Sequence, residues 1–236
     1  VFYEIIPSIS VLNKVYSNYT REEYITDISR QKIKVELSKI LETYNISDIL
    51  DIACGECYML DTLKEINPKL NLFAAEHETT KQNVINKGYK FLEGDFFPKT
   101  DIKFDLIILT EAIEHINDVN AFLEHVYKIL KPGGLIYMTT PNFSCLERLI
   151  MGSKWTMLDP PEHLSYFSPK TLNKALVNKN FTKVFNRTEN ISIFTIVEFY
   201  NGYIKNSSEH SESKEISPQN ISDKLQSATS SSFLLR

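Results

Sequence analysis

The chain has 236 residues and a formal net charge of −4, with 42% apolar and 24% charged residues. This composition is ordinary for a globular domain with a full core, and no apolar run reaches the length of a membrane span. The net negative charge disfavours extended binding to nucleic acid. Three cysteines, Cys54, Cys57 and Cys145, cannot all pair, which favours a reduced setting, and we expect a cytoplasmic location.

Predicted strands alternate with predicted helices along most of the chain. In chain order we expect one or two helices at 22–44, a strand at 47–53, a helix at 57–66, a strand at 70–75, a helix at 79–87, strands at 89–92 and 104–109, a helix at 118–130, a strand at 135–140, helices at 144–151 and 168–179, and a strand at 181–187. The segment Lys131–Gly134 is predicted as a turn. This alternation is typical of an α/β protein with a doubly wound, mostly parallel sheet.

We divide the chain into three predicted parts. An N-terminal helical cap spans 1–45, and the main domain spans 46–205 and includes an aromatic, proline-containing loop at 152–167 that we expect to contact substrate. Residues 206–236 are rich in serine and charge, which predicts a flexible tail. Phe233–Leu235 also fits the start of a last strand, so the sequence leaves open whether the tail completes the sheet.

The stretch Ile49–Cys57 organises the chain. A short apolar run surrounds Asp51, small residues and Gly55 follow, and an amphipathic segment comes next, which predicts a buried strand, a tight turn and a helix. Small residues let a ligand approach the backbone, and the start of the helix offers unpaired N–H groups. Ligands of open parallel sheets bind at the carboxyl ends of strands, where this turn lies.

Other functions for the stretch Ile49–Cys57 have weaker support in the sequence. It has one glycine where the dinucleotide fingerprint has three, and it lacks the Lys-Ser/Thr of a phosphate loop. Cys54-x-x-Cys57 formally matches a redox motif or half of a zinc site. The sequence has no second Cys pair, and both cysteines fall inside the ligand loop, so the pattern disfavours redox and zinc roles.

Four further segments downstream of Ile49–Cys57 carry recognisable motifs. They are Glu76 after the second strand, Gly94-Asp95-Phe96 after the third, Phe104-Asp105-Leu106-Ile107 in the fourth, and Leu130-Lys131-Pro132-Gly133-Gly134-Leu135 before the fifth. With Leu50–Cys57, these segments resemble the class I S-adenosylmethionine-dependent methyltransferases over roughly residues 30–187. The resemblance implies a Rossmann-like, seven-stranded sheet. A nicotinamide-dependent oxidoreductase is the alternative, which the missing Gly-x-Gly-x-x-Gly disfavours.

The resemblance also implies the cofactor, S-adenosylmethionine (SAM), with S-adenosylhomocysteine as product. It assigns cofactor binding to Asp51, Ala53, Cys54, Gly55, Glu76, His77, Gly94, Asp95, Phe96 and Thr110. In the family, Glu76 would bind the ribose hydroxyls and Asp95 would lie at the adenine, roles that suit a two-oxygen acceptor. Cys57 stands where the family usually has its last glycine, and we expect this small residue to be tolerated.

A second group of candidate residues follows the fourth strand, in Thr110–His115. If this stretch is helical, Glu111, Glu114 and His115 share one face, and His163 of the later loop can join them. Two carboxylates and two imidazoles form a plausible set of divalent-metal ligands. The pattern resembles ubiquinone-pathway O-methyltransferases and small-RNA 2′-O-methyltransferases, some of which use a metal. Without a metal, His115 or His163 is the candidate base, with Glu114 beside them, or the cluster is a structural hydrogen-bond network.

These observations lead to one main hypothesis and two alternatives. The main hypothesis is a SAM-dependent methyltransferase that methylates a hydroxyl of a small molecule of quinone, sugar or natural-product type, with or without a divalent metal. The alternatives are an RNA 2′-O-methyltransferase and a cofactor-binding pseudo-enzyme without turnover. The sequence leaves the acceptor and the oligomeric state open.

Overall fold

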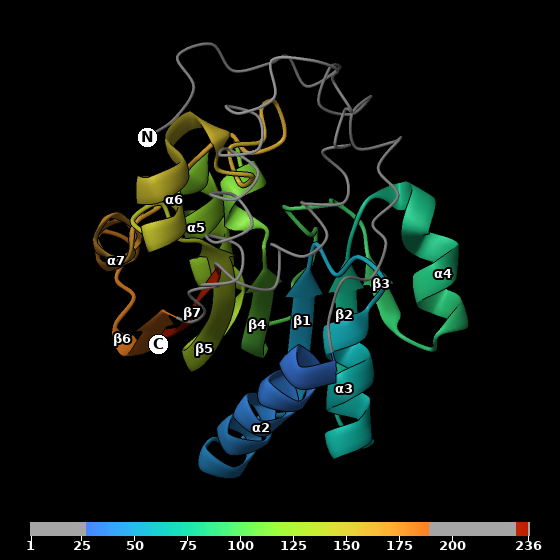
Figure 1. Cartoon of the computed structure of the whole chain (residues 1–236). Helices are drawn as coiled ribbons and strands as arrows, with labels where there is room; N and C mark the ends of the chain where they lie inside the picture. The colour runs from blue at the N-terminus through green and yellow to red at the C-terminus, as the bar shows by residue number, and fades with distance from the viewer. Residues whose placement is uncertain (1–26, 189–229, 236) are drawn as a thin grey trace.

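The computed structural model describes residues 27–188 and 230–235, which contain a seven-stranded sheet in the order β3-β2-β1-β4-β5-β7-β6 (Figure 1). The strands are β1 (Asp48–Ile52), β2 (Asn71–Ala75), β3 (Lys90–Leu92), β4 (Phe104–Thr110), β5 (Leu130–Pro141), β6 (Lys183–Thr188) and β7 (Ser230–Leu235). The helices are α2 (Asp27–Thr43), α3 (Tyr58–Ile66), α4 (Lys81–Asn86), α5 (Val119–Ile129), α6 (Leu146–Met151) and α7 (Pro169–Val177). Three 3₁₀ turns are η1 (Glu78–Thr80), η2 (Ile113–His115) and η3 (Gly152–Lys154).

The pairing of the strands confirms the predicted mostly parallel, doubly wound fold. Strands β1 to β5 pair in parallel, while β7 runs antiparallel to both β5 and β6. From β1 the chain first moves outward to β2 and β3, and it then returns to place β4 on the other side of β1. This reversal between β1 and β4 is the topological switch point, where open α/β sheets bind their ligands.

Helices cover both faces of the sheet because its central strands are apolar on both sides. Leu50 of β1 packs in one hydrophobic cluster with residues of α5 and α7, such as Phe122 and Leu172. Its neighbour Ile49 points to the other face and packs in a cluster with residues of α2 and α3, such as Leu37 and Leu60. All six side chains are fully buried, which makes the carboxyl ends of β1 and β4 a rigid platform.

The turn predicted at Lys131–Gly134 is wrong, because the segment lies inside strand β5. We expected a turn before a strand that starts at Leu135, but β5 begins at Leu130 and contains the segment as an irregularity. Leu130 pairs with Phe104 and Leu135 pairs with Leu106, so the strand bulges between them. Lys131 bridges the carboxylates of Asp48 (2.7 Å) and Asp105 (2.9 Å), which ties the bulge to β1 and β4.

The carboxyl-terminal end of the chain corrects a second prediction. The flexible tail expected at 206–236 is wrong for Ser230–Leu235, which form β7 between β5 and β6. The backbone of β7 forms hydrogen bonds with two neighbouring strands, β5 and β6. Because these backbone hydrogen bonds do not require apolar side chains, a serine-rich sequence can form the strand. Residues 206–229 and residues 1–26 of the predicted cap lie outside the described residues, and the domain boundaries stay predictions.

The position of β7 gives the first testable expectation. Leu234 is 2% exposed and packs in the same hydrophobic cluster as Ile49, so Leu234→Ala should lower the free energy of unfolding by about 2–5 kcal/mol. Leu149 of α6 is 66% exposed, and Leu149→Ala should change it by less than about 0.5 kcal/mol. Urea unfolding of both variants measures the difference. Equal effects of the two substitutions would contradict the assignment of β7.

Candidate active site

The loop between β1 and α3 makes a tight turn at the carboxyl end of β1. The Ala53 N–H donates to the Ala75 carbonyl (2.8 Å), and the Cys57 N–H donates to the Cys54 carbonyl (2.8 Å). Ala53, Gly55 and Cys57 have positive φ angles of 58°, 51° and 63°. Left-handed backbone at non-glycine residues is costly and is concentrated at functional sites, so this turn has the character of a binding loop.

Glu76 joins this loop to the end of β2. Its carboxylate accepts hydrogen bonds from the Gly55 N–H (2.9 Å) and from the His77 N–H (2.9 Å). The two bonds use different oxygens, and each carboxylate oxygen has a second lone pair. Glu76 is therefore held in one orientation while it can still accept hydrogen bonds from a diol.

Asp95 approaches Glu76 from the end of β3. Burial, together with the negative charge of Glu76, raises the pKa of Asp95 to about 6. The turn that presents Asp95 needs a glycine before it, since Gly94 has a φ of 115° and a Cβ there would lie 2.3 Å from the Phe97 carbonyl oxygen. Two acids from successive strands thus converge beside the β1 loop, as the motif pattern implied.

The remaining predicted cofactor residues take different positions. Asp51 is fully buried in β1, and Thr110 ends β4. Phe96 packs against the hydrophobic cluster of α5 and α7. The imidazole of His77 accepts from the Thr79 N–H and caps η1, so His77 contributes its backbone N–H to the site. Their contact with SAM stays a prediction.

The segment after β4 departs from the predicted helix. Glu111 has a φ of 48°, and the single 3₁₀ turn η2 begins only at Ile113. Glu111 therefore does not share a turn with Glu114 and His115, and it is outside the group of metal-ligand side chains that the structure brings together. This corrects the four-residue set expected from sequence.

That group consists of Glu114, His115 and His163, whose ligand atoms lie within 4.8 Å of one another. Glu114 is 1% exposed, and one of its oxygens accepts from the Thr140 hydroxyl (2.9 Å). The rings of His115 and His163 meet edge to face, with centroids 4.8 Å apart.

Backbone carbonyls orient both imidazoles. His115 Nδ1 lies 3.0 Å from the Glu162 carbonyl oxygen, and His163 Nδ1 lies 2.8 Å from that of Met157. A carbonyl can only accept, so each Nδ1 carries the proton when the ring is neutral. The lone pair then belongs to Nε2 of each ring, the arrangement that serves a metal ligand or a base.

The loop at 152–167 is fixed against η2. The N–H groups of Leu164 and Ser165 both donate to the Glu114 carbonyl (2.8 and 3.0 Å), which places His163 beside His115. Sequence reasoning missed these backbone partners, because a carbonyl or N–H group leaves no mark in the amino-acid pattern. It also missed Thr140, whose only signal was a polar residue at the end of an apolar strand.

Comparisons with known proteins agree with this geometry. A family model described as a methyltransferase domain matches residues 20–185, and the chain belongs to this family. Together with the fold and the convergent acids, this makes the chain a class I SAM-dependent methyltransferase and confirms the resemblance noted in the sequence.

Two similar relatives have known names. A ubiquinone biosynthesis O-methyltransferase of Bartonella tribocorum is 27% identical over 180 residues, which cover 69% of this chain and 70% of the relative. A mitochondrial ubiquinone biosynthesis O-methyltransferase of Dictyostelium discoideum is 28% identical over 190 residues, with 69% of this chain and 59% of the relative covered. The first two relatives are thus matched over about two thirds of their own length.

Solved structures share the fold at low sequence identity. A SAM-dependent methyltransferase from Archaeoglobus fulgidus has a TM-score of 0.57 and 16% identity, with 88% of this chain and 94% of that chain covered. Coclaurine N-methyltransferase, bound to N-methylheliamine and S-adenosylhomocysteine, has a TM-score of 0.61 and 12% identity, with coverage of 92% and 74%.

Within residues 27–188 and 230–235, each helix is too short or too polar to cross a bilayer. The cytoplasmic location stays a prediction, because the Dictyostelium relative is named mitochondrial.

The geometry of Glu76 gives a second expectation. Glu76→Ala should weaken SAM binding by about 1.5–3 kcal/mol, the usual contribution of a hydrogen bond to a charged group. Titration calorimetry with the full chain measures the change. Glu78, which is exposed and pairs with Lys81 (2.9 Å), provides the matched control, and Glu78→Ala should leave the affinity unchanged. Unchanged affinity in a folded Glu76→Ala variant would remove Glu76 from the site.

The raised pKa of Asp95 gives a third expectation. Asp95 has a pKa of about 6 in the folded chain. An unfolded chain has a value near 3.9, so the folded state holds the proton more tightly. The free energy of unfolding should therefore fall as pH rises from about 4 to about 6 and stay lower above that range. Asp95→Asn should remove this fall in the free energy of unfolding, because Asn does not titrate. Asn also tolerates the φ of 51° at this position.

Urea unfolding at about pH 4 and about pH 7.5 tests this expectation. The stability of Asp95→Asn relative to the parent chain should be higher at the upper pH. Exposed Asp101 serves as control, and Asp101→Asn should show a smaller change between the two pH values. An equal change for both variants would contradict the burial of a charged Asp95.

Proposed function

We propose that this methyltransferase transfers the methyl group of SAM to a hydroxyl of a small-molecule acceptor. The observation that carries the proposal is the pair of imidazoles beside Glu114, after β4 and one strand away from the β1 loop. The relatives named ubiquinone biosynthesis O-methyltransferases support oxygen as the acceptor atom and a quinone-type molecule as the acceptor. RNA is not proposed, because a net charge of −4 disfavours binding to phosphates.

The chain's own residues supply position and a proton acceptor. Methyl transfer is an in-line displacement at the sulfonium, so alignment of donor and acceptor accounts for much of the rate. Glu76, Gly55 and Asp95 would fix the adenosine, and the acceptor hydroxyl would face His115 and His163. An imidazole whose Nδ1–H is held by a carbonyl can take the hydroxyl proton at Nε2.

The same cluster fits a divalent metal. One carboxylate and two imidazole nitrogens within 4.8 Å suit Zn²⁺, Mn²⁺ or Fe²⁺, and the carbonyl partners of both Nδ1 atoms match the supporting contacts of metal-bound histidines. Glu114, His115 and His163 would hold the ion. When bound, the ion would lower the pKa of the acceptor hydroxyl.

Replacement of the two imidazoles tests the proposal. His115→Ala and His163→Ala should each lower methyl transfer by about 10²–10⁴-fold and leave SAM affinity nearly unchanged, because the histidines act on the acceptor. Transfer is measured with methyl-labelled SAM and a panel of catechols, with 3,4-dihydroxybenzoate as the first probe. Exposed Lys170 of α7 is the control, and Lys170→Ala should keep full activity.

A chelator-treated sample separates the two versions of the chemistry. Loss of transfer that returns with added Zn²⁺, Mn²⁺ or Fe²⁺ would establish the metal, and full transfer without metal would assign the proton to an imidazole alone. Full activity of a variant that lacks both histidines would contradict both versions. Absence of transfer from the SAM-bound parent chain to every hydroxyl acceptor would contradict O-methylation.

A further inference from the structure

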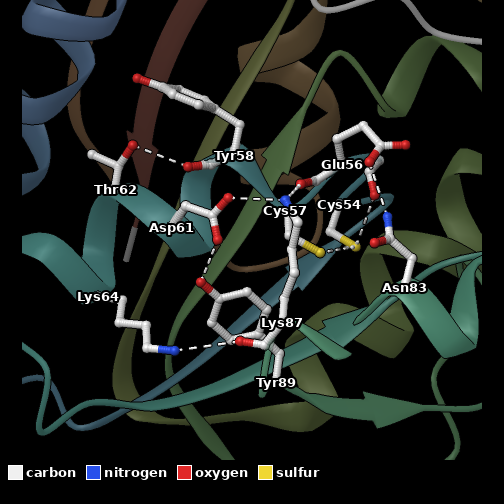
Figure 2. A network of polar contacts seen from close by, with 11 residues as sticks. Cys54, Glu56, Cys57, Tyr58, Asp61, Thr62, Lys64, Asn83, Lys87 and Tyr89 are labelled. Atoms are coloured by element: carbon white, nitrogen blue, oxygen red, sulfur yellow. Dashed lines mark hydrogen bonds and ion pairs between the residues drawn. The ribbon is translucent and has the colours of Figure 1, made fainter. Parts of the chain in front are cut away.

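Cys54 and Cys57 form a buried thiol pair in the loop after β1, which the proposed chemistry does not use. Figure 2 shows their sulfur atoms facing each other, and the Sγ–Sγ distance is 3.7 Å. Cys57 is fully buried, while Cys54 is 8% exposed. Cys54 is also one residue before Gly55, whose N–H is held by Glu76.

The surroundings of the two sulfurs are different. The hydrogen bond from the Cys54 thiol and the nearby Lys87 ammonium lower the pKa of Cys57. The same hydrogen bond, burial and the charge of Asp51 raise the pKa of Cys54. Cys57 also precedes the first turn of α3, a position that favours a thiolate. Of the two thiols, Cys57 therefore ionises more readily and is the more nucleophilic sulfur.

A network of polar contacts fixes the Cys57 side of the loop (Figure 2). Lys87 donates to the Glu56 carbonyl and to the Asp61 carboxylate of α3 (3.0 Å). Asn83 of α4 donates to the Glu56 carboxylate (2.9 Å). Asn83 of α4 and Lys87 at the end of the same helix thus hold Glu56, and α3 begins directly after Cys57. Any movement that brings the sulfurs together must fall mainly on Cys54 and the adjoining Gly55.

We propose that Cys54 and Cys57 are a redox-sensitive modification site, which hydrogen peroxide converts to a disulfide that weakens SAM binding. In this reaction an S–S bond replaces two S–H bonds, and the pair loses two electrons. The O–O bond of one peroxide breaks, its oxygens take up the two electrons and two thiol protons, and two waters leave. The proposal rests on the assignment of the β1 loop and Glu76 to the cofactor site.

The geometry explains why the bond would weaken cofactor binding. A disulfide brings the sulfurs to about 2.0 Å, much closer than in the thiol pair. The shift of Cys54 would displace the Gly55 N–H from Glu76 and release the carboxylate that is expected to hold the ribose. Because coupling between two sites is reciprocal, bound SAM should in turn slow oxidation of the pair.

The test compares the SAM affinity of the full chain before and after peroxide treatment. Intact-mass analysis with thiol alkylation should show loss of two hydrogens at Cys54 and Cys57, and calorimetry should show affinity lowered by roughly tenfold or more. Dithiothreitol should restore it. The readout is binding and needs no acceptor, so failure of the proposed O-methylation would leave this test unaffected.

Variants separate this pair from other thiols. Cys57→Gly suits the φ of 63° and removes one partner, so its affinity should be the same before and after peroxide; Cys54→Ser provides a second test. Cys145→Ser, on the loop before α6, should keep the full loss of affinity. Three results would overturn the proposal: thiols that stay reduced under peroxide, a disulfide that leaves affinity unchanged, or a Cys57→Gly variant that still loses affinity.

Discussion

The carboxylate of Glu76 links the two strand ends that form the proposed cofactor side of the site. It accepts from the Gly55 N–H of the β1 loop and from the N–H that follows β2, at 2.9 Å each. This bridge fixes the Gly55 side of a loop with three left-handed residues, while the Cys57-to-Cys54 bond and the contacts of Glu56 with α4 hold its other side. Burial and the charge of the same carboxylate raise the pKa of Asp95.

The proposed catalytic side of the site depends on a different kind of contact. Two backbone N–H groups of the loop at 152–167 donate hydrogen bonds to the Glu114 carbonyl, and two backbone carbonyls of the same loop orient the imidazoles of His115 and His163. The turn η2 carries Glu114 and His115, while the loop carries His163, so the cluster exists only when the loop is folded against η2. The loop also places the buried ring of Tyr166 against His163, and Tyr166 shares a hydrophobic cluster with Trp155.

Much of this was predictable from sequence because strong local patterns agree with the tertiary structure. The apolar run to Asp51, followed by small residues, predicted a strand and a turn. The positions of Glu76 and Asp95 directly after predicted strands indicated that both acids lie at the same edge of the sheet. Where the expectations were wrong, the deciding contacts were distant in sequence or lay in the backbone. The bulge at Lys131 depends on two distant carboxylates, β7 depends on pairing by serine backbone, and Glu111 is excluded by a single left-handed φ.

The central claim is that one crevice, at the carboxyl ends of β1, β2 and β4, holds the cofactor on Glu76 and presents its sulfur to His115 and His163. A crystal structure of the full chain with S-adenosylhomocysteine tests this most directly. The account predicts ribose hydroxyls within hydrogen-bond distance of the Glu76 carboxylate and the sulfur directed toward the two imidazoles. A nucleoside bound away from Glu76, or a sulfur that faces away from His115 and His163, would contradict it.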